Sequence, residues 1–170
     1  WHGEQVDTLI VHGEQGIGDE IMYLSLVHRF RGRAKRLICE VTPRLVALMR
    51  RSLGELGVEV YASLAEVAAN GGMDIADAEP KKLHSSGLDL SHISIVGEQK
   101  PSIVSCASLP YVLALGRTQV RSPGYLMADP VRVNYWREKL LTEAKGRPIV
   151  GIAWEGGVRK THKKVRNPPF

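Results

Sequence analysis

Apolar and polar positions follow two different patterns over the first 70 residues of the chain, one typical of strands and one typical of helices. Short runs rich in β-branched and apolar side chains predict strands at residues 8–12, 37–41 and 58–61. Helix-like spacing of apolar residues predicts helices at residues 19–31, 43–53 and 64–69. Strands that alternate with helices in this way predict an α/β fold, in which a parallel sheet carries helices on both faces.

The pattern weakens in the middle of the chain, between residues 74 and 100. Prolines, glycines, serines and scattered apolar residues there predict a loop or partly ordered insert with one strand at 93–96. Regular spacing then returns and predicts a buried strand at 103–106. A helix is expected directly after it, with Ser108 as its cap and Pro110 in its first turn.

The last 40 residues carry signals for a further helix and a further strand. Asp129 followed by Pro130 is typical of a helix start, and Lys145 followed by Gly146 is typical of a helix end. The apolar run that comes next predicts a buried strand at 148–154. We therefore expect a main α/β domain, a connecting helix and the start of a truncated second domain, at residues 1–128, 129–147 and 148–170.

Composition is that of an ordinary globular protein, with 44% hydrophobic and 24% charged residues among 170. No apolar run approaches the roughly 20 residues that cross a bilayer, and the polar start has no secretory signal and no methionine. We therefore expect a fragment of a longer protein. Cys39 and Cys106 lie in apolar runs without metal-ligand spacing. They are expected to be buried thiols of a cytoplasmic protein, and no metal site is expected.

The net charge of +5 comes from the end of the chain. No acid follows residue 157, and the five basic side chains beyond it account for the whole excess: Arg159, Lys160, Lys163, Lys164 and Arg166. Such a tail can bind phosphate, remain a solvated end, or recruit acidic partners with an affinity that falls steeply with salt. No interleaved aromatic residues accompany it, so no specific nucleic acid partner is expected.

A glycine turn follows the first predicted strand, in the stretch TLIVHGEQGIGDEIMYL. Gly16 and Gly18 match the first two glycines of a dinucleotide-binding turn, but Ile21 stands at the third position. Glu40 lies 22 residues after Gly18, which is about where such a fold places a ribose-binding acid. An NAD-binding domain is therefore one hypothesis for this chain.

Two acids, Asp19 and Glu20, occupy the first turn of the following helix and would repel a phosphate there. One interpretation is that both simply complement the helix dipole, which is worth about 0.3–1 kcal/mol each. The other is that a carboxylate at this edge of the sheet takes a proton from an attacking hydroxyl, while the neighbouring glycines let a substrate approach the backbone.

A second glycine turn follows the strand predicted at 148–154. Its backbone amides and cationic side chains could cradle a diphosphate, through Gly156, Gly157, Arg159, Lys160 and Thr161. The alternative is a solvated chain end without a ligand. An acidic turn in one half and a basic turn in the next suggest a transferase that works in an interdomain cleft.

Four segments, in this order, resemble a known family: VHGEQGIGDEIMY, SLPYVL, GYLMADPVRVNYWREKL and VGIAWEGG…KT…VRNPP. They are similar to the C-terminal region of bacterial tetratricopeptide-repeat proteins. That region is related to the glycosyltransferase family 9 heptosyltransferases and, more loosely, to O-linked GlcNAc transferases. The resemblance covers nearly the whole chain except residues 74–100.

This resemblance implies a GT-B architecture, in which two Rossmann-like domains face a cleft. Residues 1–128 would be the acceptor-side domain, and residues 148–170 would begin the donor-side domain. The implied reaction transfers a sugar from a nucleotide-sugar to a hydroxyl acceptor, a glycan or a protein, without a further cofactor. Tetratricopeptide repeats before Trp1 would choose protein partners.

The resemblance also implies roles for individual residues. Asp19 corresponds to a candidate catalytic base, and the motif around it would bind substrate through Glu14, Gln15, Gly16 and Gly18. The basic turn corresponds to the start of the donor-phosphate site, at Gly156, Gly157, Arg159, Lys160 and Thr161. This chain has Arg166 and Asn167 where the family usually has an Arg-Ser pair, so a hydroxyl donor is missing there.

Two alternatives to a transferase stay open. The chain could be a non-catalytic binding or scaffold domain that kept the fold and lost the chemistry, or it could be the NAD-binding domain considered above. If the chain is a fragment, it is expected to be inactive by itself. It would also expose apolar surface that a missing domain covers, which makes self-association plausible.

Overall fold

The computed structural model describes residues 1–13, 16–62, 73–75, 93–95, 100–116 and 124–152. Contacts between residues divide the chain into two units, Trp1–Asp129 and Pro130–Phe170. We call them unit 1 and unit 2.

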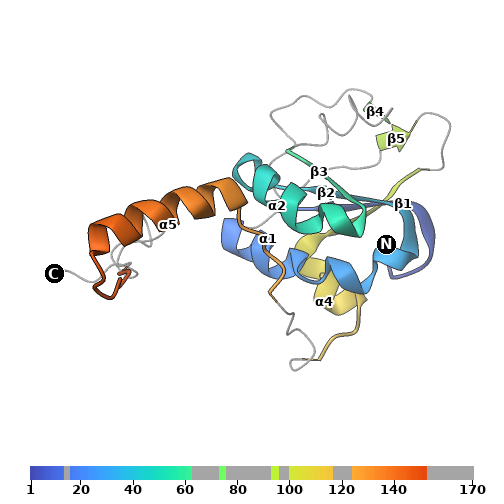
Figure 1. Cartoon of the computed structure of the whole chain (residues 1–170). Helices are drawn as coiled ribbons and strands as arrows, with labels where there is room; N and C mark the ends of the chain where they lie inside the picture. Colours follow the sequence, from blue (N-terminus) through green and yellow to red (C-terminus); the bar gives the residue numbers. More distant parts are fainter. Residues whose placement is uncertain (14–15, 63–72, 76–92, 96–99, 117–123, 153–170) are drawn as a thin grey trace, which may run out of the picture. The chain divides into compact units, whose positions relative to one another are not determined.

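Unit 1 is built on a sheet of four parallel strands in the order β3-β2-β1-β6 (Figure 1). The strands are β1 (Val6–His12), β2 (Ala34–Glu40), β3 (Val58–Tyr61) and β6 (Ser102–Ser105). Successive strands are added on one side of β1, and β6 then pairs with its other side, so the direction of strand addition reverses at β1. This arrangement confirms the predicted α/β fold with a parallel sheet.

A separate pair of short antiparallel strands lies between β3 and β6 in the sequence. It consists of β4 (Met73–Ile75) and β5 (Ile93–Ile95). The strand expected at 93–96 is thus confirmed over residues 93–95, whereas β4 was not predicted. Neither strand pairs with the four-stranded sheet.

Three helices of unit 1 follow the predicted pattern with shifted ends: α1 (Ile17–Leu24), α2 (Val46–Leu53) and α4 (Leu109–Val112). Short 3-10 turns flank them at Val27–Arg29, Arg31–Arg33, Pro43–Leu45, Gly54–Leu56 and Cys106–Ser108. The helix expected up to residue 31 ends at Leu24, and the chain continues in 3-10 turns, with the Ser25 hydroxyl donating to the Met22 carbonyl at 2.6 Å. Ser108 precedes α4, but its side chain makes no cap hydrogen bond.

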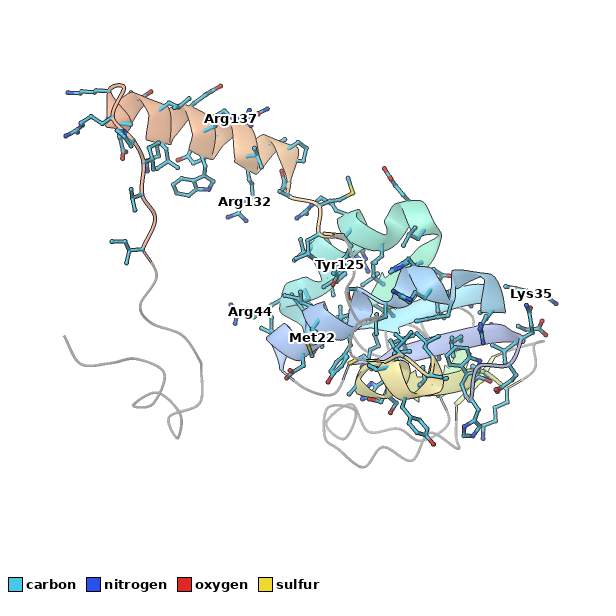
Figure 2. All side chains as sticks on the ribbon, turned by 90° about the horizontal axis from the view of Figure 1, so that it is seen from below. Met22, Lys35, Arg44, Tyr125, Arg132 and Arg137 are labelled. Atoms are coloured by element: carbon cyan, nitrogen blue, oxygen red, sulfur yellow. The ribbon has the colours of Figure 1, made fainter. Side chains whose placement is uncertain are left out.

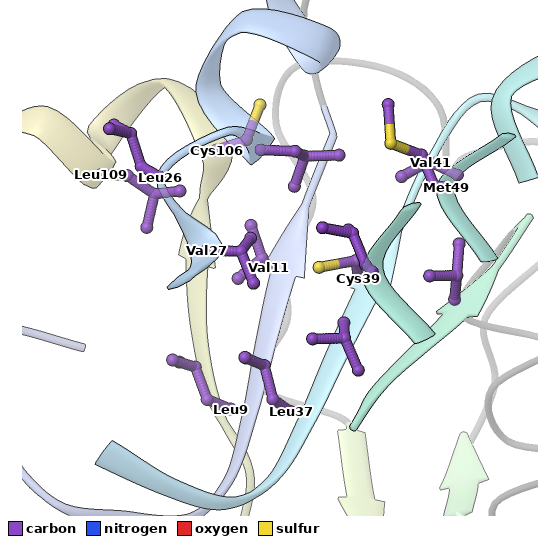
Figure 3. Packing of buried hydrophobic residues seen from close by; sticks show 14 of the residues in the cluster. Leu9, Val11, Leu26, Val27, Leu37, Cys39, Val41, Met49, Cys106 and Leu109 are labelled. Atoms are coloured by element: carbon purple, nitrogen blue, oxygen red, sulfur yellow. The ribbon is translucent and has the colours of Figure 1, made fainter. Parts of the chain in front are cut away.

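The hydrophobic core lies between one face of the sheet and these helices (Figure 3). The sheet contributes Leu9, Val11, Leu37, Cys39, Val58, Val60 and Val104, and the helices contribute Leu24, Met49, Leu53 and Leu109. Ile10 and Ile38 project to the opposite face and are fully buried as well. Both faces of the sheet are therefore covered, although the helix expected at 64–69 lies outside the described residues.

A segment before the end of unit 1 is fastened to α1 and α2. The Tyr125 hydroxyl donates to the Ile21 carbonyl at 2.7 Å, so the phenol lies against α1 (Figure 2). The Met127 amide donates to the Ser52 hydroxyl at 2.9 Å on α2. These bonds anchor residues 124–129 to the helical layer.

Unit 2 begins with α5 (Pro130–Ala144), which starts and ends where the sequence predicts. Lys145 and Gly146 follow it with φ of 50° and 80°, the left-handed conformation that ends many helices. The strand expected at 148–154 is wrong over residues 148–152, which form no strand and expose Ile149, Val150 and Ile152. Neither sheet among the described residues offers this run a partner strand. Within the described part of the chain, no helix has the length and apolar character needed to span a membrane.

Candidate functional site at the carboxyl edge of the sheet

The four parallel strands end at one edge of the sheet, here named the carboxyl edge. Their last residues stand side by side, because His12 pairs in register with both Glu40 and Ser105, and Glu40 pairs with Tyr61. Lys35, near the start of β2, lies at the other end of the sheet from Arg44, which follows β2 (Figure 2). Open α/β sheets bind ligands outside the carboxyl ends of their strands, where the strand order reverses. In this sheet that point lies between β1 and β6.

Gly13 carries the chain from β1 into the glycine turn, where there is no room for a side chain. Its amide donates to the Glu40 carbonyl at 2.9 Å, so the turn remains attached to β2. A Cβ atom at Gly13 would lie 2.9 Å from Cδ of Glu20 and 3.0 Å from the Glu40 carbonyl oxygen. Sequence reasoning missed this residue, because it considered only the two glycines of the dinucleotide pattern.

Gly16 and Gly18, the predicted substrate-binding glycines, lie on the exposed start of α1. Gly16 is the residue that precedes the first helical turn, and Gly18 has open space where a Cβ atom would be. The predicted partners Glu14 and Gln15 lie outside the described residues, as do Gly156, Gly157, Arg159, Lys160 and Thr161.

Asp19 is exposed on the first turn of α1. Its Oδ2 accepts a hydrogen bond from the Gly16 amide at 3.2 Å, and its own amide donates to the Gly16 carbonyl at 2.9 Å. The carboxylate therefore closes the start of the helix as a cap and complements the positive end of its dipole. It remains open to solvent at the carboxyl edge.

Glu20, the neighbouring acid, is buried with only 1% of its surface exposed. Its carboxylate accepts hydrogen bonds from the Thr42 amide at 2.8 Å and from the Thr42 hydroxyl, with one oxygen for each donor. Glu20 thus ties α1 to Thr42, two residues after the end of β2. Two adjacent acids that look alike in the sequence have different tasks, since one is a structural anchor and the other is accessible.

His12 and Glu40 form a second polar pair at this edge. His12 Nδ1 is bonded to Oε2 of Glu40, and the side chains are 12% and 2% exposed, respectively. Oε1 of Glu40 is buried without a hydrogen-bond partner. Glu40 is the acid that the NAD hypothesis assigned to a ribose, but its burial against His12 keeps it from serving that purpose. Sequence reasoning missed His12, although a polar residue ends β1 directly beside the acid that ends β2.

A third polar group stabilises the outer strand of the sheet. Arg36 binds Glu59 through two bonds of 2.7 and 2.8 Å, and the Tyr61 hydroxyl donates to the same carboxylate at 2.8 Å. Arg36 lowers the pKa of Glu59, and burial together with the bond to Glu59 raises the pKa of Tyr61. The guanidinium of Arg50 lies 6.0 Å from the ring centre of Tyr61 and donates to the Val60 carbonyl. These contacts fix β3 rather than offer a free reactive group.

Both cysteines are buried thiols outside any disulfide, as predicted. Burial raises the pKa of Cys39 far above its usual range, so this thiol stays protonated and unreactive. In the described ranges, no group of three or more His, Cys, Asp or Glu side chains is placed to hold a metal ion.

A shallow polar cavity of about 360 Å³ lies at the opposite, amino edge of the sheet. Asp7, Lys35, Lys100 and Ser102 are among its lining residues. Lys35 pairs with Asp7 at 2.6 Å, and the lysine side chain is 83% exposed. An exposed ion pair of this kind contributes little to stability. The carboxyl edge is the better candidate site, because open α/β sheets bind ligands where the strand order reverses.

Comparison of the chain with protein-family models, with curated proteins and with solved structures found no match. The assignment of a function therefore rests on the carboxyl edge and on the motifs that follow its strands.

Proposed function

We propose that unit 1 is the acceptor-side domain of a glycosyltransferase of GT-B type, which transfers a sugar from a nucleotide-sugar to a hydroxyl. The order β3-β2-β1-β6 supports a Rossmann-like domain, because it matches the first four strand positions of the doubly wound sheet. The resemblance of the EQGIGD turn and of the later motifs to bacterial tetratricopeptide-repeat glycosyltransferases supports the class of reaction.

The observation that carries this proposal is the chemistry of the carboxyl edge. The accessible group on the first turn of α1 is a carboxylate, Asp19, and a second buried carboxylate, Glu20, lies behind it. Such a turn repels a phosphate but accepts hydrogen bonds from a hydroxyl. The acceptor would therefore bind here, with Asp19 as the proton acceptor that the family resemblance implies. The donor's phosphates would bind the basic turn at Gly156, Gly157, Arg159, Lys160 and Thr161.

The second candidate is a non-catalytic protein-binding domain, which α5 favours. This helix buries none of its residues and exposes large apolar side chains, among them Val131, Tyr135, Trp136 and Leu141. Exposed aromatic residues are common at protein interfaces. The NAD hypothesis is weaker than both, since Glu40 is buried and Ile21 replaces the third glycine.

Calorimetry with UDP-glucose, GDP-glucose, ADP-glucose and NAD tests the proposal on the intact protein that carries this chain. We expect one sugar nucleotide to bind, and the double variant Arg159→Gln/Lys160→Gln to weaken that binding at least tenfold. The matched control is Arg132→Gln/Arg137→Gln, which removes the same charge from α5. Equal weakening by both double variants would show non-specific attraction. Binding of no nucleotide would favour the protein-binding domain, and binding of NAD alone would favour a dehydrogenase.

A further inference from the structure

We infer that two copies of this chain associate through α5, with the two helices side by side and antiparallel. The exposed apolar face of this helix is thus covered by the same face of a second copy. The inference goes beyond the proposed function and does not depend on it, because it uses no residue of the carboxyl edge or of the basic turn.

The first argument is an apolar seam along α5, formed by Val133, Trp136, Leu140 and Ala144. These residues follow one another at steps of three, four and four positions, the spacing that puts side chains on one face of a helix. None of them is buried, and the three larger ones are exposed. The seam runs along roughly 16 Å of helix, which allows a continuous contact over about three turns.

Trp136 is the anchor of this seam and is held in place before any partner binds. Its ring meets the Tyr135 ring edge to face, with the ring centres 5.3 Å apart. The Lys139 ammonium lies 5.2 Å from the centre of the same tryptophan ring. Large aromatic side chains dominate the energy of protein interfaces, and a side chain that is already ordered loses little entropy on binding.

The second argument is that charges on α5 oppose the dipole of the helix. Arg132 is its third residue, near the positive end, and Glu143 is its last residue but one, near the negative end. Helices are stabilised by the reverse arrangement, with acids at the start and bases at the end. The two side chains are about three turns apart, too far to pair within one helix. An antiparallel copy brings Glu143 and the negative helix end beside Arg132, at both ends of the pair.

The third argument is that the charges and the seam require the same register. Arg132 and Glu143 are separated by about three whole turns, so they stand on one flank of the helix, next to the seam. In an antiparallel pair of identical helices, each flank meets its own copy. When Arg132 lies beside Glu143 of the second copy, the first seam residue, Val133, lies near the last seam residue of that copy, Ala144. One register therefore satisfies both sets of contacts.

The opposite flank of α5 carries Arg137, which would face Arg137 of the second copy. Its guanidinium donates to Asn134 Oδ1 at 3.3 Å, so the side chain is directed towards the start of its own helix. In an antiparallel pair the two helix starts lie at opposite ends, and the two guanidinium groups therefore point away from each other. This arrangement limits the repulsion between them.

Sedimentation velocity of the intact protein that carries this chain, over about a hundredfold range of concentration, tests the association. We expect a reversible equilibrium between monomer and dimer. Leu140→Ala should weaken the dimer about tenfold because it shortens a seam side chain, whereas Leu141→Ala should stay within about twofold of wild type. Both leucines are exposed, so neither change should unfold the chain. A protein that stays monomeric, or a dimer that the two variants affect equally, would overturn the inference.

Charge reversal tests the antiparallel register. Arg132→Glu and Glu143→Arg each place like charges side by side at both ends of the pair, so each variant alone should dimerise at least about tenfold more weakly. An equimolar mixture of the two should recover wild-type affinity, because opposite charges then meet at both ends of the mixed dimer. Each reversal also improves the match to the helix dipole, so circular dichroism should show no loss of helix. A mixture that stays monomeric, or single variants that dimerise like wild type, would contradict the inference.

Discussion

Replacement of Gly13 by alanine tests how closely β1, β2 and α1 approach one another at the candidate site. The new Cβ atom would lie 2.9 Å from Cδ of Glu20 and 3.0 Å from the Glu40 carbonyl oxygen, whereas non-bonded atoms prefer roughly 3.5–4.0 Å. Neither neighbour can withdraw freely, because Thr42 binds the Glu20 carboxylate and the Gly13 amide binds the Glu40 carbonyl. The backbone at Gly13 is not in the left-handed region, so the expected cost is steric alone.

The matched control is Gly18→Ala, since a Cβ atom at Gly18 meets nothing within 4 Å. Alanine also restricts the unfolded chain, which favours the folded state by about 0.4–1 kcal/mol in both variants. Overpacking adds a penalty of about 1–3 kcal/mol in Gly13→Ala only. The free energies of unfolding of the two variants should therefore differ by about 1–3 kcal/mol, with Gly18→Ala at or above wild type.

Urea unfolding followed by circular dichroism measures both free energies. A double-mutant cycle with Glu20→Ala identifies the source of the penalty, because that variant removes two of the three atoms that the new methyl group would meet, Cδ and Oε2 of Glu20. We expect a coupling energy of about 0.5–1 kcal/mol, since the clash with the Glu40 carbonyl remains. Equal stability of Gly13→Ala and Gly18→Ala would show that the turn has room to move. The close approach described at this edge would then be wrong.

Two further predictions concern the elements around the site. Tyr125→Phe should lower the free energy of unfolding by about 0.5–1.5 kcal/mol, because it removes the 2.7 Å bond to the Ile21 carbonyl, whereas Tyr111→Phe should change nothing, since Tyr111 is 88% exposed. Arg36 lowers the pKa of Glu59 below 4.5 in the folded state, so this pair contributes stability that is present above pH 4.5 and is lost as the pH falls through the lowered value. Glu59→Gln should flatten the acid side of the curve of thermal midpoint against pH. An unchanged slope would contradict the stabilising role of the ion pair between Arg36 and Glu59.

The strands of unit 1 could be predicted from the sequence because the residues that they bury in the core lie in short runs of β-branched and apolar side chains. Three runs, at 8–12, 37–41 and 58–61, became strands of the sheet. The same reasoning failed at 148–152, because an apolar run becomes a strand only where another strand supplies hydrogen-bond partners. Helix ends were less predictable, since α1 gives way to 3-10 turns after Leu24 although the apolar spacing continues to residue 31.

The position of the candidate site could be predicted from the sequence, but the contacts between its side chains could not. The glycine turn and both acids were located from the sequence, and the different fates of Asp19 and Glu20 follow from helix phase. Glu20 lies one turn before the buried Leu24, and Asp19 points away from that face. The pair of His12 and Glu40 depends instead on the register of two parallel strands separated by a helix. No local pattern encodes that register.

The start of α1 is poorly suited to a phosphate for a reason that goes beyond the charge of its acids. Helix starts bind anions through free amides, but here the amides of Asp19 and Glu20 both donate to the Gly16 carbonyl, and the Gly16 amide donates to the Asp19 carboxylate. These amides are therefore used within the turn, and the exposed Asp19 carboxylate stands on the same turn as the amides of Ile17 and Gly18. The exposed Asp19 carboxylate is a hydrogen-bond acceptor, which suits a neutral ligand with hydroxyl groups better than a phosphate. Any anionic part of the ligand must then be held elsewhere, and the basic stretch that begins at Arg159 has the charge for it.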